Sequence, residues 1–254
     1  MSLSLSASKP KIFIAGLSWG RGEWVGPNVV HRGIEQYFTD DGYQVYNVSK
    51  PRSTHTRVNQ LLNECLSNHY SPGDIVFWIQ ADPVIDIIAE EVAGKLLPNQ
   101  KLIRLSERLL SAGSLVGLML DQQSRIYCEL NNIAVKYNTH INCIGGTYNI
   151  NPIIQEFSNL NQFVTSWINM LVGHYTEYAR SAEINFGVTH TWTVDNIDFS
   201  AYNVELATTI RNEIDERVAN IIMFREDIFH PDGVHPNRDG HMMLYKYIKR
   251  ELNL

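Results

Sequence analysis

The order in which strand-like and helix-like segments alternate constrains the fold of this chain more than any other feature. Short strands are predicted at residues 11–15, 43–48, 74–79 and 140–144. The run at 74–79 is continuously apolar after its first residue, which is typical of a strand buried on both faces of a parallel sheet. The alternation therefore predicts a three-layer α/β/α sandwich with a mainly parallel central sheet and right-handed crossovers.

The segments between and after these strands carry apolar residues at helical spacing. We expect helices over residues 29–38, 58–66, 83–94, 121–137, 163–178, 206–221 and 240–252. At 254 residues the chain fits one domain over residues 11–254, with a helical embellishment around 155–200. The Ser-rich segment 1–10 is predicted to be a flexible leader.

Composition excludes several classes of function. The net charge of −6 and the lack of a Lys/Arg cluster argue against binding to nucleic acid or an anionic membrane. No apolar stretch reaches the length of about 18 residues that a membrane span needs. Segment 1–10 lacks the basic and apolar regions of a signal peptide, so a cytoplasmic location is expected. Cys65, Cys128 and Cys143 match neither a disulfide framework nor a zinc spacing.

A rigid loop near the end of the sequence carries two titratable side chains. Residues 230–237 read His-Pro-Asp-Gly-Val-His-Pro-Asn, a composition unsuited to a helix interior. Asp232 and His235 lie three residues apart in this loop. An imidazole held by a carboxylate is a general base that needs a nucleophile.

A candidate nucleophile lies at the opposite end of the chain. Ser18 follows the first predicted strand in a glycine-punctuated turn, residues 16–24. Open α/β sheets bind ligands at the carboxyl ends of their strands, so a hydroxyl there is well placed for chemistry. Taken singly, Ser18 also fits a turn or cap, Asp232 an Asx turn and His235 a surface histidine. Their joint occurrence favours a catalytic role.

The two ends of the chain together resemble the SGNH (GDSL-type) hydrolase family. In that family a Gly-Asp-Ser turn after the first strand carries the nucleophilic serine, and an Asp-x-x-His motif near the C-terminus completes a triad. The matching residues are Ser18, Asp232 and His235. The resemblance spans nearly the whole chain and implies a flavodoxin-like fold and ester hydrolysis without a cofactor or metal.

The sequence departs from the family pattern around the expected oxyanion hole. Leu17 stands where the family usually has Asp. The second family block, which should supply an oxyanion-hole glycine, falls on residues 47–53 and contains no glycine. The third block, Gly-x-Asn-Asp, falls on residues 79–82, where only Asp82 matches. The triad therefore carries over residue by residue, whereas the oxyanion hole does not.

Other residues are candidates for stabilising an oxyanion or binding the substrate. The backbone N–H of Ser18 and the side-chain amide of Gln80 are candidate donors, although Gln80 equally suits the capping of a strand end. The backbones of Ser49 and Ser53 are further candidates in the second block. Trp19 either lines a substrate groove or packs the turn against the next helix.

The expected function is therefore that of a serine esterase acting on a small acyl ester, such as an O-acetyl group on a carbohydrate. The run at 16–24 is similar to hydrolase-like proteins encoded by bacteriophages, which implies an association with a virion or a host glycan. The rival is a non-catalytic member of the same fold, serving as a carbohydrate-binding or virion structural module. The Gly145-Gly146 pair resembles a turn that holds a phosphate, which makes nucleotide binding a further alternative. The Lys-Ser/Thr pair that completes such a phosphate-binding loop does not follow these glycines.

Overall fold

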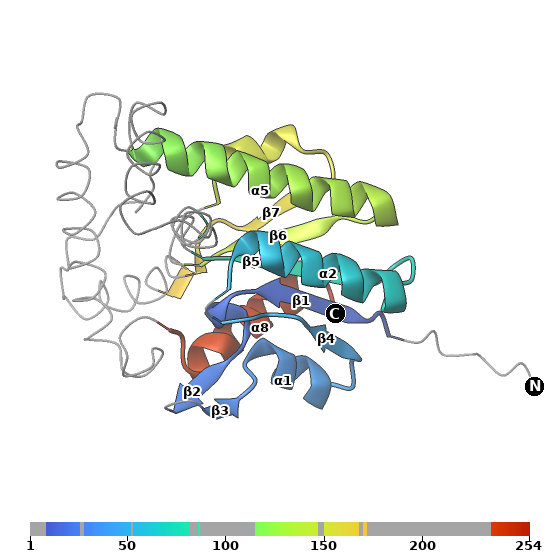
Figure 1. Ribbon diagram of the computed structural model, residues 1–254. Helices are drawn as coiled ribbons and strands as arrows, with labels where there is room; N and C mark the ends of the chain where they lie inside the picture. Colours follow the sequence, from blue (N-terminus) through green and yellow to red (C-terminus); the bar gives the residue numbers. More distant parts are fainter. Residues whose placement is uncertain are drawn as a thin grey trace, which may run out of the picture.

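The computed structural model describes residues 9–25, 28–51, 53–81, 86, 115–146, 150–167, 170–171 and 235–254. Within these residues, five strands form a parallel sheet in the order β4-β1-β5-β6-β7 (Figure 1). The strands are β1 (Ile12–Gly16), β4 (Val45–Asn47), β5 (Ile75–Gln80), β6 (Ile141–Gly145) and β7 (Leu160–Val164). The predicted parallel sheet is confirmed.

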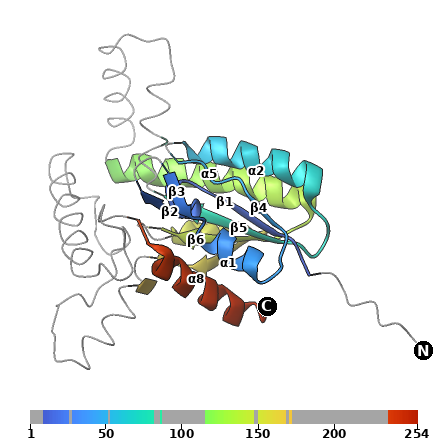
Figure 2. The same cartoon turned by 90° about the horizontal axis from the view of Figure 1, so that it is seen from below.

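Helices cover both faces of the sheet, so the predicted three-layer sandwich is also confirmed. Helices α2 (His55–His69) and α5 (Leu115–Tyr137) lie on one face, and α1 (Ile34–Asp40) and α8 (Arg238–Glu251) lie on the other (Figure 2). Side chains of β1 alternate between two buried cores, with Ile12 and Ile14 facing α1 and α8. Phe13 and Ala15 face α2 and α5.

Side-chain caps set the start of two of these helices. The Thr54 hydroxyl accepts a hydrogen bond of 3.0 Å from the backbone N–H of Arg57 at the start of α2. The Asn237 side chain accepts from the N–H groups of Asp239 and Gly240, at 2.9 and 3.0 Å, at the start of α8. These contacts satisfy backbone donors that have no partner within the helix.

The structure corrects two predicted helices. The segment predicted as a helix over 29–38 begins as a strand, β3 (Asn28–His31), which pairs antiparallel with β2 (Glu23–Val25). Gly33, with φ of +59°, then separates this hairpin from α1. The predicted helix over 163–178 begins within β7, a short edge strand whose polar middle hides its strand character.

Several predicted segments lie wholly or mostly outside the described residues. They are the N-terminal leader up to residue 8, the predicted helices 83–94 and 206–221, and most of the embellishment around 155–200. None of the described helices is both long and apolar enough to span a membrane.

His241 is a fully buried histidine of α8. Neither of its ring nitrogens has a hydrogen-bond partner among the described residues. Burial, with a smaller effect of His31 and His235, lowers the pKa of His241 from 6.5 to about 3. Between about pH 3 and 6.5, His241 therefore binds a proton in the unfolded chain but not in the folded chain.

We predict that stability is fully present above about pH 6.5 and falls as the pH drops towards 3. One such histidine contributes a slope of up to about 1.4 kcal/mol per pH unit. His241→Phe should flatten this slope in denaturant unfolding measured at pH 7 and pH 5. Replacement of the exposed His69 by Gln serves as the control. An unchanged slope in His241→Phe would show that His241 is not the acid-sensitive group.

Candidate active site

Ser18 lies where the carboxyl end of β1 meets two neighbouring strands. It begins a short 3-10 turn, Ser18–Gly20, that the Arg21 N–H closes by donating to the Ser18 carbonyl at 3.0 Å. Strand β1 lies between β4 and β5, and the crossovers from β1 to β4 and from β4 to β5 pass over opposite faces of the sheet. Such a reversal opens a crevice at the strand ends, which is the usual ligand site of open α/β sheets.

The structure brings Ser18 and His235 together from opposite ends of the chain. The Nε2 atom of His235 lies 2.7 Å from the Oγ atom of Ser18, across 217 positions of sequence. His235 is half-buried just before α8. This distance is within the range over which a general base takes a proton from a hydroxyl. Asp232 lies outside the described residues, so its place in a triad stays a prediction.

Two glycines allow the serine turn to pack closely onto the sheet. A Cβ atom on Gly20 would lie 2.3 Å from the Ser49 Oγ and 3.0 Å from the Ser49 Cβ. A Cβ atom on Gly16 would lie 3.0 Å from the Ile79 Cβ. These distances are shorter than ordinary contact, so a larger residue at either position would force the turn or its neighbour to shift.

The segment that carries His235 is tied to the structure around Ser18. Arg238 donates from Nε to the Glu23 carboxylate at 2.9 Å, and Glu23 lies five residues after Ser18. The Tyr37 hydroxyl donates to the Arg238 carbonyl at 2.9 Å. These contacts join the first turn of α8 to β2 and to α1, beside the candidate base.

Trp19 packs in the core. Its side chain is 3% exposed and meets Trp167 edge to face, with the ring centroids 5.4 Å apart. The His235 ring lies 6.5 Å from it. Of the two roles that the sequence left open for Trp19, this placement favours packing over the lining of an open groove.

The candidate oxyanion donors differ in their surroundings. The backbone N–H of Ser18 donates to no group in the described part of the chain. The Ser49 N–H donates to the Asn47 Oδ1 at 2.9 Å, so it is already engaged. Ser53 lies half-buried before α2, and no described contact joins it to Ser18. Of these three backbone groups, that of Ser18 is the best placed.

Gln80 is buried, with 2% exposure, at the end of β5. Its side-chain Oε1 accepts a hydrogen bond of 2.6 Å from the Tyr127 hydroxyl, and its carbonyl accepts from the Gly146 N–H at 3.0 Å. These contacts fit the capping role that the sequence offered for Gln80. Donation from its amide nitrogen to an oxyanion stays a prediction.

A buried histidine–aspartate pair was missed by sequence reasoning. The Nδ1 atom of His55 contacts the carboxylate of Asp86, and its Nε2 accepts from the Ala81 N–H at 2.9 Å. Because Nε2 accepts a hydrogen bond, the ring N–H that faces Asp86 is that of Nδ1. The pair fixes the chain just after β5 and leaves no ring nitrogen to serve as a base. His55 and Asp86 are 31 positions apart, so no local sequence pattern indicates that they pair.

No metal centre is found among the residues that the structure describes, since no three of their His, Cys, Asp or Glu side chains come close enough to hold an ion. His230, near His235 in the sequence, lies outside the described ranges. His241 packs against Trp167, with the ring centroids 4.8 Å apart.

Comparison with known proteins finds distant structural likeness. No family model matches the sequence, and no curated protein does. A psychrotrophic esterase from Pseudoalteromonas sp., inhibited by monoethylphosphonate in that structure, is 14% identical with a TM-score of 0.42, over 97% of this chain and 100% of its own. A lipase/acylhydrolase from Enterococcus faecalis is 13% identical with a TM-score of 0.38, over 96% of this chain and 95% of its own. At these values neither activity transfers to this chain.

The fit between Gly20 and Ser49 can be tested by a double-mutant cycle. Gly20→Ala should destabilise the protein by about 1–3 kcal/mol, because the new methyl group overlaps Ser49. Ser49→Gly removes both overlapping atoms, so it should recover part of that loss in the Gly20→Ala background. Denaturant unfolding of both single variants and the double variant measures the coupling. If the changes in the free energy of unfolding are additive, the two residues do not interact sterically.

Proposed function

We propose that this protein is a serine esterase of the SGNH type that hydrolyses a small acyl ester. The observation that carries the proposal is the distance of 2.7 Å between the Ser18 Oγ and the His235 Nε2 at the carboxyl end of β1. A serine hydroxyl is a weak nucleophile until a base accepts its proton. A neighbouring imidazole is the side chain best suited to that task near neutral pH.

The proposed reaction has two halves. In the first, the Ser18 Oγ attacks the ester carbonyl carbon while its proton passes to the His235 Nε2. The tetrahedral intermediate collapses, and the leaving alkoxide takes that proton from Nε2 and departs as an alcohol. In the second half, water loses a proton to Nε2 and attacks the acyl-serine. The carboxylic acid then leaves, and the proton returns from Nε2 to the Ser18 oxygen.

Charge develops on the carbonyl oxygen in both halves of this reaction. The Ser18 N–H, which donates to no described group, supports the role of one oxyanion donor. In this proposal Asp232 accepts a hydrogen bond from the His235 ring and stabilises the imidazolium. Gln80 is the proposed side-chain donor at the end of β5.

The proposed substrate is a short acyl ester, with an O-acetylated glycan as the first class to test. The family resemblance of Ser18, Asp232 and His235 supports the ester. A second candidate function is a non-catalytic module that binds glycan. The engaged N–H of Ser49 favours that alternative, because it removes one backbone donor from the second block.

A fluorophosphonate probe tests the proposal directly. Intact-mass analysis should show one adduct on the wild-type protein and none on Ser18→Ala. His235→Ala should lower the kcat for p-nitrophenyl acetate by about 10³-fold or more, since the base is lost. A folded wild-type protein that gives neither adduct nor hydrolysis would overturn the esterase and favour the non-catalytic module.

A further inference from the structure

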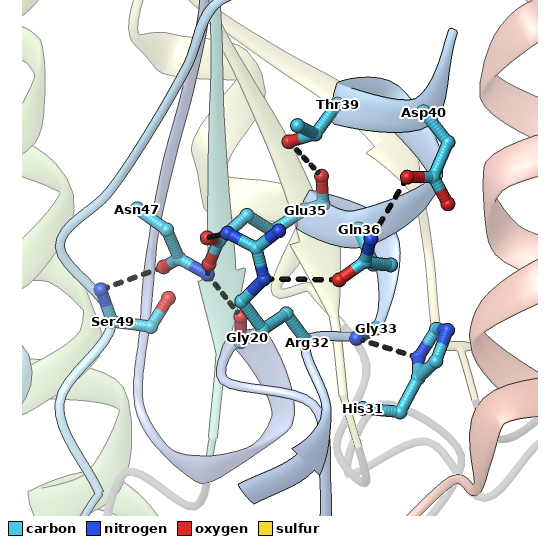
Figure 3. A network of polar contacts seen from close by, with 10 residues as sticks. All are labelled: Gly20, His31, Arg32, Gly33, Glu35, Gln36, Thr39, Asp40, Asn47 and Ser49. Atoms are coloured by element: carbon cyan, nitrogen blue, oxygen red, sulfur yellow. Dashed lines mark hydrogen bonds and ion pairs between the residues drawn. The ribbon is translucent and has the colours of Figure 1, made fainter.

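The side chain of Asn47 joins three separate segments beneath the Ser18 turn. Its Nδ2 donates to the Gly20 carbonyl and to the Glu35 carboxylate, each at 2.9 Å. Its Oδ1 accepts from the Ser49 N–H at 2.9 Å (Figure 3). The amide thus connects the end of β4 with the serine turn and with α1.

These contacts fix which way the amide points. Oδ1 faces a backbone donor, whereas Nδ2 faces a carbonyl oxygen and a carboxylate oxygen. A flipped amide would place its oxygen against two other oxygens and its NH₂ against an N–H. Only one orientation therefore satisfies all of the surrounding groups.

Glu35, the partner of Asn47, is itself held in place. Its second carboxylate oxygen accepts from Arg32 Nη1 at 2.8 Å, and Arg32 also donates from Nε to Gln36 Oε1 at 3.0 Å (Figure 3). Glu35 is the charged acceptor nearest to Nδ2, and hydrogen bonds to charged groups are the stronger ones. The carboxylate therefore orients the amide, and the amide in turn holds Gly20.

The held carbonyl lies at the end of the turn that presents Ser18. The Ser18 end of the turn is fixed by the hydrogen bond from the Arg21 N–H, and the Gly20 end is fixed by Asn47. Movement of this turn would shift both the Ser18 hydroxyl and its N–H relative to His235. A displacement of about 1 Å can cost about 10²-fold in rate.

We propose that Asn47, oriented by Glu35, is a positioning residue that fixes the serine turn for attack. Asn47 acts through Gly20 and touches neither the substrate nor the reacting atoms. The inference rests on the proposed esterase function, because it assigns Asn47 a role in that reaction. A purely structural Asn47 would instead tie β4 to α1 without affecting the chemistry.

Two substitutions separate these roles. Asn47→Asp replaces the donor by an oxygen that faces both the Gly20 carbonyl and the Glu35 carboxylate, so both Tm and kcat should fall. Adding Glu35→Gln supplies an amide that donates to the new carboxylate and removes the charge repulsion. The double variant should recover most of the Tm, yet its Gly20 carbonyl still lacks the donor. Its kcat should stay about 10- to 100-fold below that of the wild type, with KM little changed.

The measurement uses p-nitrophenyl acetate at 10 °C. Circular dichroism of each variant at the same temperature gives the folded fraction, which separates unfolding from slowed chemistry. Glu35→Gln alone keeps an oxygen acceptor for Nδ2 and should lower kcat less than threefold. Gln44→Ala, at an exposed position just before β4 and outside this network, is the matched control and should leave kcat unchanged.

The outcomes distinguish this inference from the esterase proposal. A double variant that regains both Tm and kcat would show that Asn47 is structural only, as would failure to fold of Asn47→Asp both alone and combined with Glu35→Gln. Either result would overturn the inference and leave the esterase proposal standing, provided that the fluorophosphonate labels Ser18 in the wild type. An unlabelled and inactive wild type would overturn both.

Discussion

The position of β1 between β4 and β5 is the constraint on which the rest of the site depends. The chain leaves β1 over one face to reach β4 and returns over the other face to β5. The turn after β1 therefore opens into the crevice where the crossovers diverge. Helix α8 packs on the same face as α1, which brings the end of the chain, and with it His235, to this turn.

The two members of the Ser18–His235 pair are held by different kinds of interaction. The serine turn is anchored by a part-buried hydrogen bond from Asn47 and by close packing of its glycines. The histidine segment is anchored at Arg238 by an ion pair with Glu23, and the Arg238 side chain is 55% exposed. Exposed ion pairs are weakened by salt, whereas part-buried hydrogen bonds are screened much less. The ion pair at Arg238 is thus the more salt-sensitive of the two anchors.

The sequence predicted the parts of the fold that depend on strong local patterns. Strand β5 was predicted from the continuous apolar run at 74–79, and β1 from the apolar run that precedes Ser18. The pairing of Ser18 with His235 followed from their order along the chain and from a family resemblance. Pattern alone did not reveal β7, because Asn161 and Gln162 interrupt its apolar character at a sheet edge.

Contacts between distant segments were beyond the reach of sequence reasoning. Asn47 lies 27 positions from Gly20 in the sequence. The hydrogen bond between them forms only when β4 pairs with β1. His55 likewise finds Asp86 and the Ala81 N–H only after β5 has been placed. Trp19 was ambiguous from sequence because a bulky turn residue packs inward or outward according to its neighbours. Trp19 packs inward because it contacts Trp167, which lies 148 positions away in the sequence.

In the proposed mechanism Ser18 is the nucleophile, His235 is its base and the Ser18 N–H stabilises the oxyanion. A crystal structure of the fluorophosphonate-treated protein would test these three roles together. We expect continuous density from the Ser18 Oγ to phosphorus, with a phosphoryl oxygen at hydrogen-bond distance from the Ser18 N–H and His235 beside the adduct. An unmodified Ser18, or phosphorus bonded to another residue, would show that Ser18 is not the nucleophile.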